Sequence, residues 1–261
     1  MSRGLLRRLV PTPVRFWLGS IRQTLRALGQ WPWYIRSFRA YRALAKAAGR
    51  PLPNPWVAYP CLLDRTSQTG FDRHYTYHPA WAARVLARTR PDKHIDISST
   101  VVFAAMASAF VPVAFYDYRP ADIHLSNLET GAADVLALPF ADGSVRSLSC
   151  MHVLEHIGLG RYGDPLDPDG DRKAIQELIR VLAPGGDLLI VLPCGKPGVF
   201  FNAHRAYDFA SVPALFAPLT LVESAALLDH EDGRGLIAAP PPALIAQQDN
   251  GLGCFWFRKA A

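Results

Sequence analysis

The segment Val145-Arg-Ser-Leu-Ser-Cys-Met-His-Val-Leu-Glu-His156 decides the fold class. Its first seven residues follow the turn-forming stretch Ala141-Asp-Gly-Ser144, and His152 comes directly after them. A short run bounded in this way is typical of a buried strand, here Val145–Met151. In an open parallel sheet, ligands bind beyond the carboxyl ends of the strands, so the residues that follow Met151 are the first candidates for a site.

Strand-like and helix-like segments alternate on both sides of this strand. Further strands are predicted at His94–Ile97, Val113–Asp117, Asp134–Leu136, Asp187–Leu192, Leu219–Leu227 and Cys254–Arg258. Helices are predicted at Trp81–Arg88, Val101–Phe110, Asp171–Leu182 and Ser211–Phe216. Such alternation implies right-handed crossovers, and it predicts an α/β domain with a mostly parallel sheet.

The composition is that of a globular protein, with 50% hydrophobic and 19% charged residues in a chain of 261. No run approaches the roughly 18 uninterrupted apolar residues of a membrane-spanning helix. The four cysteines lie far apart and form no CxxC pair, which disfavours a zinc cluster or a disulfide framework. We therefore expect a reducing compartment, the cytoplasm.

Charge divides the chain into a basic arm and an acidic body. Residues 1–63 hold 11 Lys and Arg and no Asp or Glu, whereas the rest of the chain holds 17 basic and 22 acidic residues. In Trp33–Ala48 the aromatic and basic residues fall on different faces of a predicted helix, and the arm repeats this pattern earlier, in Gly4–Val10 and Val14–Leu28.

Four prolines between Gly49 and Pro60 end the arm. We expect a basic amphipathic helical arm and Pro-rich linker over residues 1–60, and one α/β domain over residues 61–261.

Several interpretations of the arm stay open. Residues 1–48 are suited to peripheral contact with an anionic membrane surface, which would be the inner face of the cytoplasmic membrane. Packing on the body or on a partner protein is the alternative, and an Arg-rich transit peptide fits the composition too. Nucleic acid is a weaker hypothesis, because the net negative charge of the body offers no extended phosphate track.

Three motifs resemble class I S-adenosylmethionine-dependent methyltransferases. They are Asp134-Val-Leu-Ala-Leu-Pro-Phe-Ala-Asp142, Met151-His-Val-Leu-Glu-His156 and Arg180-Val-Leu-Ala-Pro-Gly-Gly186. The run His152–Asp171, with Phe201-Asn-Ala-His-Arg205 downstream, is more specifically similar to an uncharacterised bacterial family of unknown function that is associated with glycan biosynthesis. The resemblance implies a Rossmann-like sandwich whose last strand is antiparallel, with S-adenosylmethionine as cofactor.

The resemblance also implies cofactor contacts for residues that follow the strands. The expected contacts are Asp96, Ser98 and Ser99 with the methionine moiety, Asp117 and its neighbour Tyr118 with the ribose, Asp134 and Val135 with the adenine, and Met151 and His152 with the sulfonium.

One departure from the superfamily pattern concerns the glycine-rich loop after the first strand. Its three glycine positions are occupied by Ser98, Thr100 and Val102. Glycine permits positive φ and close backbone approach, which β-branched residues tolerate poorly. Either the Ser98 and Ser99 hydroxyls and a helix that begins near Thr100 still bind the carboxylate, or cofactor affinity has been lost.

The methyl transfer that the resemblance implies would need the protein to align an acceptor and to remove its proton where it carries one. The candidate bases are His156 and, second, His204, since imidazole titrates near neutral pH. Polar side chains suited to orienting a small-molecule or saccharide acceptor follow the fourth and fifth strands: Arg161, Tyr162, Asn202 and Arg205. The function predicted is methyl transfer to a polar acceptor. The rival is a non-catalytic scaffold in a membrane-associated glycan-assembly complex, which the degenerate glycine loop favours.

Two metal motifs are weaker alternatives, and we expect no metal. His152-Val-Leu-Glu-His156 fits the H-x-x-E-H pattern of inverted zinc proteases, yet Gly158 and Gly160 would stop the required helix within one turn. Four aspartates resemble a calcium loop with misplaced glycine spacing, and Asp-Pro and Asp-Gly pairs also form turns: Asp164, Asp167, Asp169 and Asp171.

Overall fold

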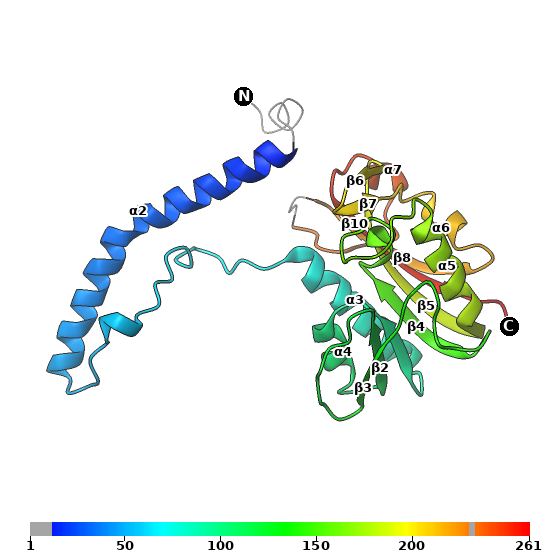
Figure 1. Cartoon of the computed structure of the whole chain (residues 1–261), viewed down its shortest axis with the longest axis horizontal. Coiled ribbons are helices and arrows are strands. Elements are labelled where there is room, and N and C mark those ends of the chain that lie inside the picture. The colour runs from blue at the N-terminus through cyan, green and yellow to red at the C-terminus, as the bar shows by residue number, and fades with distance from the viewer. Residues whose placement is uncertain (1–11, 230–232) are drawn as a thin grey trace. The chain divides into compact units, whose positions relative to one another are not determined.

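The computed structural model describes residues 12–229 and 233–261 (Figure 1). The described chain forms two compact units, one that ends at Gly70 and one that begins at Phe71. The sequence predicts this boundary ten residues earlier, between residues 60 and 61. In the structure, residues 61–70 therefore belong with the arm.

The arm consists of the long helix α2 (Thr12–Ala47), followed by the short 3-10 helix η1 (Pro55–Val57). The two predicted helical pieces Val14–Leu28 and Trp33–Ala48 are joined into one helix that contains Pro32. Proline lacks an N–H, so one backbone hydrogen bond is missing at that point. The predicted piece Gly4–Val10 lies outside the described residues. Within the described residues, no helix is both long and apolar enough to cross a bilayer.

The second unit is built on an eight-stranded sheet with the order β3-β2-β1-β4-β5-β10-β8-β9. Its strands are β1 (His94–Ile97), β2 (Val113–Asp117), β3 (Leu128–Ala132), β4 (Val145–Met151), β5 (Leu182–Cys194), β8 (Thr220–Leu227), β9 (Ile237–Ala238) and β10 (Gly251–Arg258). Strands β1 to β5 run parallel, and β10 inserts antiparallel between β5 and β8. The predicted mostly parallel sheet with an antiparallel last strand is confirmed. A separate hairpin pairs β6 (Gly198–Phe200) with β7 (His204–Ala206).

Helices cover both faces of the sheet. They are α3 (Arg73–Thr89), α4 (Val101–Ala107), α5 (Gly170–Val181), α6 (Val212–Leu215) and α7 (Pro242–Ile245), with the 3-10 turn η2 (Leu154–His156) after β4. Along β5, Leu189 and Val191 pack with α3 and α4, whereas Leu188 and Ile190 pack with α5 on the opposite side. Because successive side chains of a strand point to opposite faces, a strand buried on both faces is apolar at nearly every position.

The third predicted strand is wrong. Asp134–Leu136 is a tight turn, in which the Ala137 N–H donates to the Asp134 carbonyl (2.9 Å) and the Leu136 N–H donates to the Asp134 carboxylate (2.8 Å). The strand lies earlier, at Leu128–Ala132, on the edge of the parallel part of the sheet and largely outside the core. An edge strand needs no apolar alternation, and Asp favours turns because its side chain bonds to the backbone two residues on.

A buried polar network joins β1 to β4, where the strand order reverses. The His94 ring bonds to the hydroxyls of Ser147 and Ser149 (both 2.8 Å), and Ser149 donates to Asp96. Burial lowers the pKa of His94 to about 3, so the ring is neutral. Burial raises the pKa of Asp96 to about 6, against the hydrogen bonds from Ser149 and Ser99.

Ser149→Ala removes the group that satisfies both buried partners. We expect the free energy of unfolding to fall by about 2–4 kcal/mol, because an unpaired buried polar group costs roughly 1–3 kcal/mol. Urea denaturation of the purified protein measures this. The control Ser144→Ala, whose hydroxyl bonds to Ala141 at the surface, should change stability by less than about 0.5 kcal/mol. Equal effects of the two substitutions would contradict the network's importance.

Candidate functional site

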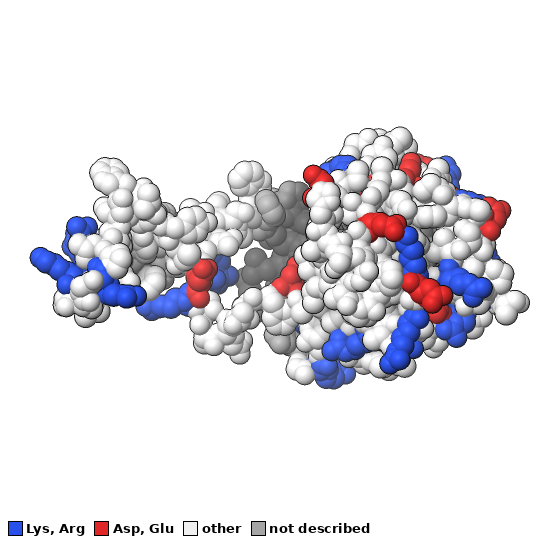
Figure 2. Space-filling view, turned by 90° about the horizontal axis from the view of Figure 1, so that it is seen from below, with Lys and Arg blue, Asp and Glu red and all other residues white. Residues whose placement is uncertain are grey.

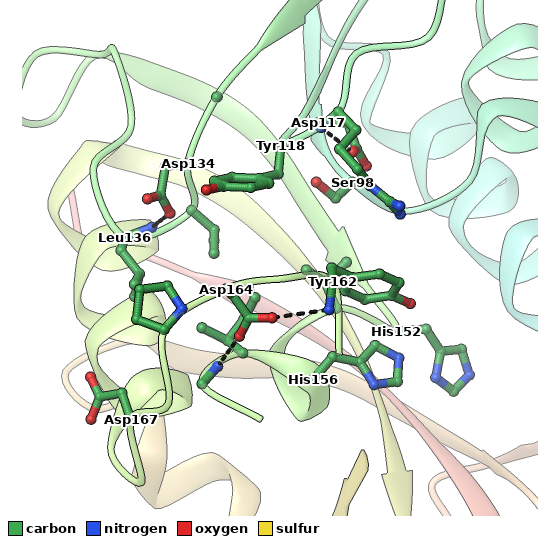
Figure 3. Close-up of a pocket in the computed structure, with 17 residues that line it drawn as sticks. Ser98, Asp117, Tyr118, Asp134, Leu136, His152, His156, Tyr162, Asp164 and Asp167 are labelled. Carbon is green, nitrogen blue, oxygen red and sulfur yellow. Dashed lines mark hydrogen bonds between the residues drawn. The ribbon is translucent and has the colours of Figure 1, made fainter. Parts of the chain in front are cut away.

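A cavity of about 210 Å³ lies at the carboxyl ends of the parallel strands (Figure 3). Its walls come from the residues after four strands and from the loop after η2. After the strands these are Ser98, Asp117, Tyr118, Arg119, Ala133, Asp134, Val135, Leu136, His152 and Val153; from η2 and the loop they are His156, Ile157, Gly158, Tyr162, Asp164, Pro165 and Asp167. Ligands of open α/β sheets bind at this edge, near the strands where the order reverses.

Two carboxylates stand on one side of the cavity. Asp117 ends β2 and accepts the Arg119 N–H on one oxygen (2.8 Å). Asp134 accepts the Leu136 N–H on one oxygen (2.8 Å). Figure 3 shows the Tyr118 ring between the Asp117 and Asp134 backbones, next to Asp134. The second oxygen of Asp117 has no hydrogen-bond partner within the described parts of the chain, so it is available to a diol.

The loop after β1 keeps a left-handed residue at the first glycine position. Ser98 has φ +55, and its N–H donates to the Tyr116 carbonyl (2.7 Å). Thr100 is extended and caps α4 by accepting the Phe103 N–H (3.1 Å), and Val102 is exposed on α4. Neither β-branched residue is forced into positive φ. The three residues that replace the glycines therefore fit the backbone of this loop, and only Ser98 adopts a strained conformation.

His152 and Glu155 form a buried pair at the opposite wall. The His152 Nδ1 bonds to Glu155 Oε1 (2.7 Å), and the two side chains are 7% and 1% exposed. With the Glu155 oxygen as acceptor, Nδ1 donates this hydrogen bond and Nε2 keeps a free lone pair. His152 Nε2 and Glu155 Oε2 are buried atoms without a hydrogen-bond partner in the described structure. His152 has φ +59, a left-handed conformation that costs a non-glycine residue free energy.

The first turns of α3 cover the His152 ring. His74 and Tyr75 stack on it with ring centroids 5.6 and 5.5 Å away, and His78 meets it edge-on at 5.0 Å. The His78 Nδ1 bonds to the His74 carbonyl (2.7 Å). Burial, followed by the nearby His152, lowers the pKa of both His74 and His78, that of His78 to about 3. The cover is therefore neutral and keeps water from His152.

A ring stack forms the rim of the cavity. The guanidinium groups of Arg119 and Arg161 lie 4.7 and 5.2 Å from the Tyr162 ring centroid. The Tyr162 ring meets His156 edge-on at 5.8 Å. Two guanidinium groups at an exposed rim favour a polar or anionic group at the entrance.

The fold is similar to that of solved methyltransferases at low sequence identity. The N-methyltransferase NodS from Bradyrhizobium japonicum, solved with S-adenosylhomocysteine, is 17% identical with a TM-score of 0.51, over 83% of this chain and 98% of NodS. The 1,6-didemethyltoxoflavin-N1-methyltransferase from Burkholderia thailandensis is 16% identical with a TM-score of 0.50, over 72% of this chain and 81% of that enzyme. The fold is that of class I methyltransferases.

A family model described as a Caenorhabditis protein of unknown function, DUF268, matches residues 142–231. Among curated proteins, none matches. The matched region begins just before β4 and ends after β8, so it contains His152, Glu155 and the loop that follows them. The resemblance to a bacterial family associated with glycan biosynthesis is not supported, because the matching family model is described differently.

Within this methyltransferase fold, the structure brings together part of the predicted site. The predicted residues that line the cavity are Ser98, Asp117, Tyr118, Asp134, Val135, His152, His156 and Tyr162. Arg161 lies beside them, with an Nη1 atom 3.0 Å from the Ala203 carbonyl and 3.2 Å from His156 Nδ1.

Two predicted contacts lie behind the cavity. The Asp96 carboxylate accepts from the Ser99 N–H (3.0 Å) and from Ser149, and the Ser99 hydroxyl accepts the Met151 N–H (3.0 Å). Met151 itself is fully buried in the core with α3 and α4, so the prediction of its contact with the sulfonium needs correction: strand alternation turns its side chain away from the site.

Three predicted residues after β5 do not reach the cavity. Arg205 is buried, and its guanidinium donates to the carbonyls of Ile157 (2.6 Å), Asp167 and Pro168 (both 3.3 Å). These three hydrogen bonds fix the loop after η2. His204 stacks on Phe200 in the small hairpin (5.0 Å), and Asn202 lies exposed in the turn between β6 and β7.

His156 lines the cavity, but its ring is already bound. Its Nδ1 lies 2.6 Å from the Ala203 carbonyl, and burial lowers its pKa. Its Nε2 is 3.8 Å from Glu155 Oε1, farther than the His152 nitrogen. Of the two histidines beside Glu155, His152 is the one that Glu155 holds by a hydrogen bond, whereas His156 as the base stays a prediction.

The metal motifs are explained by protein contacts. In the described residues, no group of three or more His, Cys, Asp or Glu side chains is arranged to hold a metal ion. The aspartates that resemble a calcium loop have separate partners. Asp164 accepts the Gly158 and Tyr162 N–H groups, Asp167 and Asp169 pair with Lys173 and Arg172, and Asp171 accepts the Tyr207 hydroxyl.

Sequence reasoning missed the contribution of α3. Asp72 caps this helix by accepting the Tyr75 N–H (3.0 Å), so it begins eight residues before the predicted Trp81. The signal was present in Asp72 as an N-cap and in the four-residue spacing of His74 and His78, which places both rings on one face.

His78 makes the stability of the body dependent on pH. Its folded pKa of about 3 is below the unfolded value of about 6.5, so the stabilisation is complete above pH 6.5 and is lost as the pH falls toward 3. Between about pH 7.5 and 5.5, the free energy of unfolding should fall by about 1.4 kcal/mol more in the parent than in His78→Gln.

Urea titrations of both proteins at the two pH values measure the difference. Other titrating groups are common to both proteins and cancel. An identical pH response would mean that His78 titrates alike in the folded and unfolded chains.

Proposed function

We propose that the chain transfers a methyl group from S-adenosylmethionine to a polar acceptor bound at the mouth of the cavity. The observation that carries the proposal is Asp117: a half-buried carboxylate at the end of β2, with one oxygen held by the Arg119 N–H and the other available to a ribose diol. Bound there, the cofactor supplies an electrophilic methyl group.

The residues present fit the cofactor. Asp117 would hold the ribose, and Tyr118, Val135 and Leu136 offer an apolar place for the adenine with Asp134 at its edge. The left-handed Ser98 turns the backbone at the point where the superfamily places glycine. The two similar methyltransferases were both solved with S-adenosylhomocysteine, which supports the same ligand class here.

His152 would accept the proton of the acceptor during transfer. The Glu155 carboxylate fixes the ring through Nδ1, and Nε2, which is buried under the side chains of α3, would take the proton when this cover moves aside for the acceptor. Glu155 also stabilises the imidazolium that forms, and the neutral α3 cover excludes water. This arrangement suits an acceptor whose methylated atom carries a proton, such as a hydroxyl or an amine.

The acceptor is expected at the rim made by Arg119, Arg161 and Tyr162. Stacked rings and guanidinium groups bind saccharides and anionic groups, so a small saccharide or a related polar molecule is the acceptor class we favour. These three rim residues are the only structural support for a role of the protein in glycan assembly.

Calorimetric titration with S-adenosylhomocysteine tests the cofactor site. We expect Asp117→Ala to weaken binding about 10- to 100-fold, since hydrogen bonds to a charged group contribute about 1.5–3 kcal/mol. The matched control is Asp122→Ala in the β2–β3 loop, whose carboxylate pairs with exposed His124 (3.1 Å) and should leave binding unchanged. Absence of binding by the folded parent up to millimolar ligand would instead favour the non-catalytic scaffold.

Methyl transfer from radiolabelled S-adenosylmethionine to a panel of saccharide and amine acceptors tests the base. His152→Gln should lower kcat about 10²- to 10⁴-fold, with unchanged affinity for S-adenosylhomocysteine. His204→Gln, in the hairpin outside the cavity, serves as the control and should retain activity. Full activity of His152→Gln would assign the proton transfer elsewhere.

A further inference from the structure

Helix α2 carries a continuous apolar face. Six large side chains share this face, the adjacent pair Trp17 and Leu18 and then, at spacings of three and four, Ile21, Leu25, Leu28 and Trp31. All six are between 39% and 68% exposed, although side chains of this kind are usually buried. A face this long without cover marks a docking surface.

The linker leaves this face open. Leu62, Leu63 and Arg65 lie against a different side of α2, where they enclose a hollow of about 620 Å³ with Gly19, Arg22, Gln23, Arg26 and Gln30. Arg65 also stacks on Trp33, with its guanidinium 5.0 Å from the ring centroid. In the described part of the arm, the chain therefore covers one side of α2 and leaves the apolar side available.

The same face becomes basic toward the end of the helix. Ile35 is exposed on this face. Arg39, Arg42 and Lys46 follow it by four, seven and eleven residues, so they lie on the same face of the helix. Residues 1–63 contain no carboxylate to neutralise them. Figure 2 shows basic side chains gathered along the arm beside a broad uncharged surface.

We propose that this face of α2 docks on the surface of an anionic lipid bilayer, with Trp17–Ile35 immersed at the headgroup boundary and Arg39, Arg42 and Lys46 on acidic headgroups. Tryptophan at both ends of the apolar stretch suits the interface, and each basic residue near an anionic membrane strengthens binding. A second copy of the chain is a poorer occupant, because its identical face offers Arg39, Arg42 and Lys46 no carboxylate to pair with.

Flotation of the full chain with vesicles tests the proposal, using phosphatidylcholine alone and phosphatidylcholine with phosphatidylglycerol. Leu18→Gln with Leu25→Gln should weaken partitioning on the mixed vesicles about 100-fold, because two Leu side chains lose their burial. Arg39→Gln with Arg42→Gln should weaken it about 30-fold on the mixed vesicles and leave the weak binding to phosphatidylcholine unchanged. Added salt should weaken the parent's binding.

The matched control is Ser37→Gln with Ala40→Gln, which adds the same side chains at exposed positions two and five residues beyond Ile35, off the docking face. It should float like the parent. Tryptophan fluorescence should shift to shorter wavelength on mixed vesicles in the parent and control, but not in Leu18→Gln with Leu25→Gln. Circular dichroism checks that all variants keep their helix.

Flotation of the Leu18→Gln, Leu25→Gln variant equal to the parent would overturn the proposal. So would a parent that ignores vesicles and forms a dimer that this variant dissociates, which would assign the face to a second copy. Binding of S-adenosylhomocysteine should be the same in every arm variant, so the outcome is independent of the proposed methyl transfer.

Discussion

The Ser149 hydroxyl holds together the two strands between which the sheet reverses its order. It accepts from the neutral His94 ring and donates to Asp96, so one buried group satisfies two residues of β1. Asp96 then fixes the Ser99 N–H, and Ser99 fixes the start of the chain that leaves β4. The positions of the loops that carry Ser98 and His152 both depend on this chain of hydrogen bonds, which is how a network outside the cavity shapes it.

Each of these two loops places one residue with a strained backbone at the cavity. Ser98 and His152 both have positive φ without being glycine, and both line the cavity. Such conformations cost about 1–3 kcal/mol each and persist where the surrounding structure enforces them. At Ser98 the strain preserves a turn that glycine would adopt freely. At His152 it turns the ring toward Glu155 and under α3, where burial leaves Nε2 without a partner.

The strands in the middle of the sheet could be predicted because they are buried on both faces. The predicted bounds of His94–Ile97, Val113–Asp117 and Val145–Met151 agree with β1, β2 and β4, whose residues are largely buried. The edge strand β3 could not be found in this way, since Leu128–Ala132 has few buried residues and no periodic pattern. Asp134, taken for the start of a strand, instead forms the turn that its side chain stabilises.

The sequence by itself determined the α/β class, the central strands, the acidic residue that ends β2 and the basic, carboxylate-free arm, because burial periodicity and charge are local properties of the chain. Only the tertiary structure decided which histidine beside Glu155 is oriented, that Arg205 is used by backbone carbonyls, and that His74, Tyr75 and His78 cover the site. These depend on side-chain direction and on contacts between segments far apart in the chain, which spacing along one segment does not specify.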